Sequence, residues 1–182
     1  MNTLKSFLAI TAIVACTLPV FARVSPHDTV SAVVSGSRVT ITYGRPYTKD
    51  PKSGEARKIW GTLVPYGKVW RLGADEATTL ISQKDLKFGD TTVPAGAYTL
   101  WMLPNEDGTA KLIINKQIGQ WGMGPNTYDE KNDLARIDLT KGALDTAVDE
   151  LTVSVAKNPS GGGLIKIAWE QTQYSVTFDV VK

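Results

Sequence analysis

The segment "WGTLVPYGKVWRLGADEATTLIS", residues 60–82, carries the side chains best suited to chemistry. Arg71 presents a planar fork of N–H donors that suits a carboxylate, and Asp75 or Glu76 could accept from it. The group is either a structural ion pair that fastens a loop, or a polar cluster in which Trp70 stacks on a small ligand. We favour the structural pair, because a glycine-rich loop needs its charges and backbone satisfied.

Other residues share this ambiguity between a structural and a ligand-binding role. Asp133 and Arg136 have a spacing that allows a local pair. Tryptophans in irregular sequence could cap the end of the fold, which is the simpler interpretation, or stack on a sugar. The candidate ligand-binding residues are Arg45, Trp70, Arg71, Asp75, Glu76, Trp121, Tyr128 and Arg136.

Carboxylate catalysis is a competing hypothesis. Glycoside hydrolysis needs two carboxyl groups about 5 to 10 Å apart. Asp75 and Glu76 are adjacent, so in an extended chain they point to opposite faces and cannot form this pair together. Either could act with a distant carboxylate, for example Asp129, Glu130 or Asp133. Nothing in the sequence compels such a pair, and no catalytic residue is assigned.

Histidine and cysteine chemistry is restricted by composition. The only histidine, His27 in "SPHD", is expected in an ordered tail or at the entry of the first strand. One histidine with no cysteine after residue 22 excludes a structural zinc site. The acidic loops "NEDG" and "DEKND" leave an all-oxygen calcium site open, although ordinary turn chemistry explains them equally well. We predict no cofactor and no metal.

The N-terminus has the pattern of a secretory signal peptide. Lys5 precedes an uncharged, mostly apolar run that ends at Ala22, so we expect cleavage after Ala22 and a mature chain that begins at Arg23. Cys16, in "IVAC", gives the alternative of a lipoprotein acylated at that residue. A membrane span is disfavoured, because the run is short and contains a proline. We therefore expect a periplasmic or secreted protein.

The remainder, residues 23–182, is interpreted as one domain. The chain has 20 basic and 18 acidic residues, and loss of Lys5 leaves a net charge near +1. That balance provides no basic field for nucleic acid.

Period-two alternation predicts an all-β domain, an antiparallel two-sheet sandwich of jelly-roll type. Turns are expected at 35–37, 89–90, 105–108, 141–142 and 158–163, with one possible helical turn in 141–149. The expected strands span residues 29–36, 38–44, 77–82, 97–103, 110–115, 134–139, 150–157, 164–170 and 174–181. Two long loops, from Gly44 to Asp75 and from Lys116 to Asp133, are aromatic-rich and should pack on the sheets. Gly67 and Gly73 indicate sharp reversals in the first.

Several of these stretches together resemble a bacterial secreted family known as domain of unknown function 2911. They are "ITYGRP", "IWGTLVPYGKVWRLGADEATT", "VPAGAYTLWMLP", "LIINK", "QWG" and "YDEKNDLAR". The resemblance covers nearly all of the mature chain and implies a β-rich extracytoplasmic domain with no agreed activity. One departure is Asp75, which stands where the family usually has Asn and which would replace an amide donor with an acceptor.

Three functions compete on these grounds. The leading prediction is a noncatalytic binding or envelope-associated module for a small or saccharide-like ligand. The second is a carboxylate-dependent enzyme acting on a carbohydrate or envelope molecule through Glu76. The third is a purely structural or interaction domain. One open cavity lined by the candidate residues would favour the first two.

Overall fold

The computed structural model describes residues 25–122 and 127–181. The predicted signal peptide, residues 1–22, lies outside these ranges, as do Cys16 and the predicted cleavage site. Within the described ranges, no helix has the length and apolar character needed to cross a membrane.

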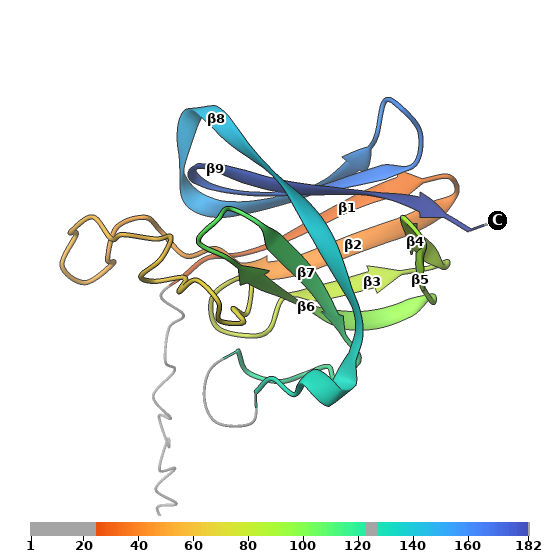
Figure 1. Ribbon diagram of the computed structural model, residues 1–182, viewed down its shortest axis with the longest axis horizontal. Coiled ribbons are helices and arrows are strands. Elements are labelled where there is room, and N and C mark those ends of the chain that lie inside the picture. Colours follow the sequence, from red (N-terminus) through yellow and green to blue (C-terminus); the bar gives the residue numbers. More distant parts are fainter. Residues whose placement is uncertain (1–24, 123–126, 182) are drawn as a thin grey trace, which may run out of the picture.

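Antiparallel strands make up the fold (Figure 1). In chain order they are β1 (His27–Val34), β2 (Ser37–Gly44), β3 (Thr79–Ser82), β4 (Leu86–Phe88), β5 (Thr91–Val93), β6 (Gly96–Pro104), β7 (Ala110–Asn115), β8 (Asp133–Lys157) and β9 (Gly163–Val180). The described residues include one short 3-10 helix, η1 (Glu130–Asn132), and no α-helix. The predicted all-β antiparallel class is confirmed.

The strands form one sheet that folds over on itself. Their hydrogen-bonded order is β1-β2-β3-β6-β7-β8-β9-β4-β5. Strand β8 pairs first with β7 and then with β9, and it also contacts β1 and β2, which are not its neighbours in that order. In Figure 1 the two longest strands, β8 and β9, lie over β1 and β2. This pairing does not confirm a separation into two sheets of jelly-roll type, which stays a prediction.

Alternating side chains fill the space between the facing parts of the sheet. Val39 and Ile41 of β2 are fully buried, while the residues between and beside them are partly or fully exposed. Ile165 and Trp169 of β9 are buried in the same apolar cluster. The period-two pattern of the sequence therefore identified the core face of these strands correctly.

The hairpin between β1 and β2 has the predicted turn. Val34 pairs with Ser37, and the two residues between them, Ser35 and Gly36, have φ values of 47° and 76°. Both are left-handed, as the turn type that matches the twist of paired strands requires.

The predictions for residues 141–149 were wrong. The expected turn at 141–142 and the helical turn both lie inside β8, where Gly142 pairs with Gln173 and Val148 with Glu170. The expected strands 164–170 and 174–181 are likewise one strand, β9. On either side of Val148 the register shifts, and β8 has more residues than the part of β9 it pairs with. These irregularities act as β-bulges, so the β8–β9 pair bends but continues. The short strands β4 and β5 were not predicted.

The described parts of two long connections contact the sheet, as expected. The first connection is residues 45–78 and the second is residues 116–132. Ile59 and Val64 of the first have no exposed surface. Trp70 N donates to Met102 O at 2.7 Å and Met102 N donates to Trp70 O at 2.8 Å, so the first connection pairs locally with β6.

Candidate ligand-binding site

The end of strand β2 is the base of the site. His27 and Gly44 face each other across the β1–β2 pair, and Gly44 O accepts a hydrogen bond from Ala74 N at 3.3 Å. A Cβ atom at position 44 would lie 2.2 Å from the carbonyl oxygen of Ala74. Glycine therefore lets the first connection lie directly against β2 beside the start of β1.

Left-handed residues shape the segment that follows Trp70. Leu72 has a φ of 54° and Asp75 a φ of 61°. Leu72 is fully buried, and its carbonyl oxygen accepts a hydrogen bond from the hydroxyl of Thr78 at 2.8 Å. The reversal predicted at Gly67 is found, with a φ of 67°, whereas near Gly73 it is the neighbouring residues that turn the chain.

Arg71 fastens the two connections together. Its Nε donates to Gly73 O at 3.0 Å and its Nη1 donates to Gly122 O at 3.3 Å. The predicted hydrogen bond from Arg71 to Asp75 or Glu76 was wrong, because backbone carbonyls take these donors. Burial lowers the pKa of Arg71, and the charge of Asp75 offsets this only in part.

Gly122 makes this arrangement possible. A Cβ atom there would lie 2.3 Å from Cδ of Arg71 and 2.7 Å from the carbonyl oxygen of Asp75. Gly122 N donates to that same oxygen at 2.8 Å. The neighbouring residue Trp121 pairs through its backbone with Glu76, while its own side chain is half exposed.

A run of aromatic rings closes the core beneath this segment. Trp70 stacks on Trp169 with ring centroids 5.9 Å apart, and the edge of Trp60 meets Trp70 at 6.3 Å. Trp60 in turn contacts Tyr174 at 5.4 Å. Trp169 is a core residue, as predicted, and the packing of Trp60 and Trp70 supports the interpretation that these rings cap the fold.

A cavity of about 310 Å³ opens beside these rings. Its wall includes Arg57, Leu63, Trp70, Arg71, Asp75 and Trp169, and we call it the Asp75 cavity. Three of the eight candidate residues, Trp70, Arg71 and Asp75, thus meet at one cavity. Arg57 was not singled out in the sequence, where it is one of several charges in an irregular stretch.

Three buried polar atoms of residues that line the Asp75 cavity lack hydrogen-bond partners among the described residues. They are Arg57 Nε, Asp75 Oδ2 and Trp169 Nε1. Trp169 is almost completely buried, with a relative exposure of 1%. Buried polar groups in native proteins are nearly always hydrogen-bonded, so three exceptions at one cavity require an explanation.

His27 lies between the two adjacent carboxylates of the site. Its Nε2 is 2.9 Å from Glu76 Oε2 and 3.8 Å from Asp75 Oδ2. The extended backbone assumed for these neighbours is not found, because Asp75 is left-handed, yet the two carboxylates line different cavities. Glu76 itself lines a neighbouring cavity of about 240 Å³ with His27. His27 does enter the first strand, as predicted, but its ion pairs were not.

Arg45 serves to attach the first connection to β8. Its Nη2 lies 3.2 Å from Glu150 Oε2 and donates to Thr152 Oγ1 at 3.3 Å. Its Nε donates to Leu151 O at 3.2 Å. Arg45 is not among the residues that line the Asp75 cavity, so it does not join Arg71 in one site.

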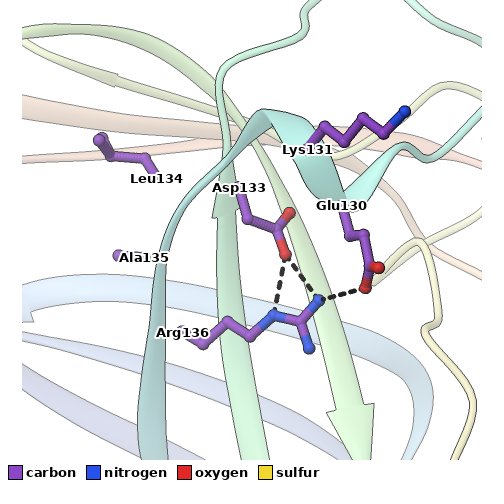
Figure 2. Close-up of a pocket in the computed structure, with 6 residues that line it drawn as sticks. All are labelled: Glu130, Lys131, Asp133, Leu134, Ala135 and Arg136. Atoms are coloured by element: carbon purple, nitrogen blue, oxygen red, sulfur yellow. Dashed lines mark hydrogen bonds and ion pairs between the residues drawn. The ribbon is translucent and has the colours of Figure 1, made fainter.

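Arg136 belongs to a separate cluster with Asp133 and Glu130 (Figure 2). Tyr128 joins this cluster through its hydroxyl. Arg136 Nε and Nη2 both lie 2.8 Å from Asp133 Oδ2, which confirms the predicted local pair. Nη2 also reaches Glu130 Oε2 at 3.4 Å. A surface depression of about 460 Å³ is lined by this pair together with Glu130, Lys131, Leu134 and Ala135.

The polar groups of this cluster satisfy one another. Tyr128 donates its hydroxyl to Asp133 Oδ2 at 2.7 Å and accepts from Arg136 Nη2 at 2.9 Å. The buried side chain of Asn115 donates to Asp133 Oδ1 at 2.9 Å. Burial and the hydrogen bond to Asp133 raise the pKa of Tyr128, and the hydrogen bond to Asp133 raises the pKa of Arg136. We call these four residues the Asp133 cluster.

The acidic loops make ordinary turn contacts. Asp107 Oδ1 accepts from the backbone and the hydroxyl of Thr109 at 2.9 and 2.7 Å. Asp129 Oδ1 accepts from Lys131 N at 3.0 Å and caps η1. These contacts match the turn interpretation of both sequences.

The fold and the site define a β-sheet protein with a small polar cavity between the first connection and strand β9. Residues 25–178 match the family described as "Protein of unknown function (DUF2911)", and the chain belongs to that family. Comparison with curated proteins gave no match, and comparison with solved structures gave none.

The backbone gives a reason for the residue at position 75. The resemblance described for the sequence implies Asn at the position of Asp75. Asn and Asp are the non-glycine residues most often found in the left-handed conformation that position 75 adopts. The exchange therefore keeps the backbone and changes the charge that faces the cavity.

Proposed function

We propose that this protein is a noncatalytic binding module that holds a small polar or saccharide-like ligand in the Asp75 cavity. The observation that carries the proposal is that three residues lining that cavity each have a buried polar atom with no hydrogen-bond partner among the described residues: Arg57 Nε, Asp75 Oδ2 and Trp169 Nε1. Each unpaired buried group costs about 1–3 kcal/mol. A ligand that supplies both an acceptor and a donor would recover part of that cost.

The enzyme alternative receives less support. Hydrolysis by carboxylates needs two of them across the substrate, and Asp75 is the only carboxylate among the described residues that line this cavity. Glu76 is held by His27 and lines the neighbouring cavity.

The purely structural alternative explains part of the site. Arg71 bonds to two backbone carbonyls and joins the two connections, which is a structural role. A purely structural role does not explain the three unpartnered polar atoms of the residues that line the cavity. These atoms favour binding over a structural role alone.

We also propose that the protein works outside the cytoplasm. The support is the sequence pattern of residues 1–22, with an acylated Cys16 as the alternative. The intact mass of the purified mature protein should correspond to a chain that begins at Arg23. A mass that includes a diacylated N-terminal cysteine would replace secretion with a lipid anchor.

A thermal-shift screen of small polar compounds and saccharides tests the binding proposal, since a ligand specific for the folded state raises the melting temperature. A compound that binds in the Asp75 cavity should stabilise the wild type and the Asp138→Asn control, whose altered carboxylate is 82% exposed. It should fail to stabilise Asp75→Asn. Equal shifts in all three proteins would place binding elsewhere.

A further inference from the structure

The unpartnered atoms of the Asp75 cavity include charged groups of both signs. Arg57 Nε belongs to a guanidinium and Asp75 Oδ2 to a carboxylate. A neutral hydroxyl can complete a hydrogen bond to either group but cannot balance its charge. Buried charges are stable only when they are paired as well as hydrogen-bonded. The chemistry therefore favours a ligand with charges of its own.

The guanidinium groups at this cavity are held by neutral partners. Arg57 Nη2 donates to Tyr47 O, and Arg71 donates to Gly73 O and Gly122 O. Neither arginine makes an ion pair with a carboxylate among the described residues. Both side chains are thus fixed in position without a direct carboxylate partner, although Arg71 feels the charge of Asp75 and Arg57 that of Asp50. Two fixed guanidinium groups beside one cavity are a preorganised arrangement for an anion.

A third donor strengthens the anion-binding side. Trp169 Nε1 is an indole N–H with no acceptor among the described residues, and it belongs to a side chain that is almost fully buried. A carboxylate has two oxygens and several acceptor positions, so one such group offers acceptors to more than one donor. Stacking against Trp70 fixes the orientation of this indole ring.

Asp75 provides the opposite charge. Its Oδ2 accepts no hydrogen bond from the described residues, and His27 Nε2, which lies 3.8 Å away, is 2.9 Å from Glu76 Oε2. An ammonium group donates up to three hydrogen bonds and has the opposite charge to this carboxylate. Leu63, which is 41% exposed, adds an apolar part to the cavity wall.

We infer that the Asp75 cavity binds a small zwitterion, a free α-amino acid or a molecule of the same charge pattern. Its carboxylate lies toward Arg57 and Trp169, and its ammonium group lies toward Asp75. The inference rests on the proposed binding function and names the ligand class for that site. The cavity volume of about 310 Å³ is at the lower end for ligand sites and suits a molecule of this size.

Isothermal titration of the mature protein tests the inference with defined probes. Each of the twenty standard L-amino acids is titrated, followed by the carboxamide and the N-acetyl derivative of any that binds, and by neutral mono- and disaccharides. We expect at least one amino acid to bind, and its amide and its N-acetyl derivative each to bind about tenfold or more weakly, because each loses a charge-assisted contact.

The variants assign each loss to a residue. Asp75→Asn should bind the amino acid and its N-acetyl derivative with equal affinity, and should still bind the carboxamide more weakly than the amino acid. Arg57→Gln should bind the amino acid and its carboxamide with equal affinity, and should still bind the N-acetyl derivative more weakly. Arg57→Lys keeps the charge and should restore part of the preference for the amino acid over its carboxamide. Asp138→Asn should behave as wild type, and the melting temperature of each variant shows whether it is folded.

The outcomes separate this inference from the proposed function. Saccharide binding that depends on Asp75, with no binding of any amino acid, would overturn the zwitterion and leave the binding module. No binding by either class would overturn the zwitterion, and an unsuccessful wider screen would then count against the module as well. Equal affinity for an amino acid and its amide would also contradict the inference, because the carboxylate would play no part.

Discussion

The Asp133 cluster and the Asp75 cavity contain the same kinds of side chain and use them in different ways. In the cluster, both oxygens of Asp133 accept hydrogen bonds, from Tyr128, Arg136 and the buried Asn115. In the cavity, Oδ2 of Asp75 accepts none from the described residues, and Arg71 turns instead to backbone carbonyls. Each region has a carboxylate with an arginine three or four positions away in the sequence.

The difference shows that proximity of charges in the sequence does not separate a structural network from a binding site. What separates them is whether the buried polar atoms are paired. A paired network stabilises the fold and has little left to offer a ligand. An unpaired set costs stability and retains its capacity to bind, which gives the comparison a measurable consequence.

The largest effect is expected from Asp133→Asn. The substitution removes the charge that Arg136 faces and weakens the hydrogen bonds that Asp133 accepts from Asn115, Tyr128 and Arg136. The free energy of unfolding should therefore fall by about 3 kcal/mol, the upper range for hydrogen bonds to a charged group. Asp133 is well enclosed, with 11% of its side chain exposed. Urea unfolding measures the change.

A control for this prediction lies on the same strand. Asp138 pairs with Lys111 at 2.7 Å but is 82% exposed, so Asp138→Asn should cost at most about 0.5 kcal/mol. If both variants lose the same stability, the enclosed network has no special role.

A smaller loss is expected from Arg71→Ala. It removes two hydrogen bonds to carbonyl oxygens and the link between the two connections, which should lower the free energy of unfolding by about 2 kcal/mol. Amide hydrogen exchange should quicken at Gly122, whose N–H donates to Asp75 O. Unchanged exchange there would mean that Arg71 does not hold the second connection.

The parts of the fold that the sequence predicted are those governed by local periodicity. Strand β7 was predicted with its observed bounds, and the β1–β2 turn was found through Gly36. The residues 141–149 were mispredicted, because Gly142 and nearby charges suggest a turn when the pairing with β9 is not known. Long-range pairing kept them in a strand, and no local pattern carries that information.

The sequence predicted several residues of the candidate site but not the atoms to which they bond. Trp70, Arg71 and Asp75 do meet at one cavity. The partner assigned to Arg71 was wrong, because its acceptor at Gly122 is 51 residues away and is a backbone atom, which leaves no signature in side-chain types. Arg57 was missed for the same reason, since only the folded chain brings it to the cavity.

Tyr128→Phe should remove about 1 kcal/mol near neutral pH, because the hydroxyl both donates to Asp133 and accepts from Arg136. The pKa of Tyr128 is raised in the folded protein above its ordinary value of 10.0. The hydroxyl therefore contributes its full stability below about pH 10, and the contribution decreases as the pH rises further, because the unfolded chain ionises first.

Urea unfolding of both proteins at several pH values from 7 to 11 checks this dependence. The pKa values of Tyr43, Tyr98 and Tyr174 are also raised, but these residues are present in both proteins and cancel in the difference. A stability difference between the two proteins that stays constant up to pH 11 would contradict a stabilising role for the Tyr128 hydroxyl proton.

The smallest effect on stability is expected from Asp75→Asn, which repeats the chemistry of Asp133→Asn in the other region. Asn tolerates the left-handed φ of 61° at this position, so the backbone need not move. Oδ2 accepts no hydrogen bond from the described residues, so the change removes only the charge that acts on Arg71 and lies near His27 at a partly exposed position. The free energy of unfolding should change by less than about 0.5 kcal/mol, the scale of a partly exposed ion pair. Urea unfolding of Asp75→Asn and Asp133→Asn measures the change in the free energy of unfolding for each variant. If Asp75→Asn loses as much stability as Asp133→Asn, both carboxylates support the fold, and the contrast between the two regions would disappear.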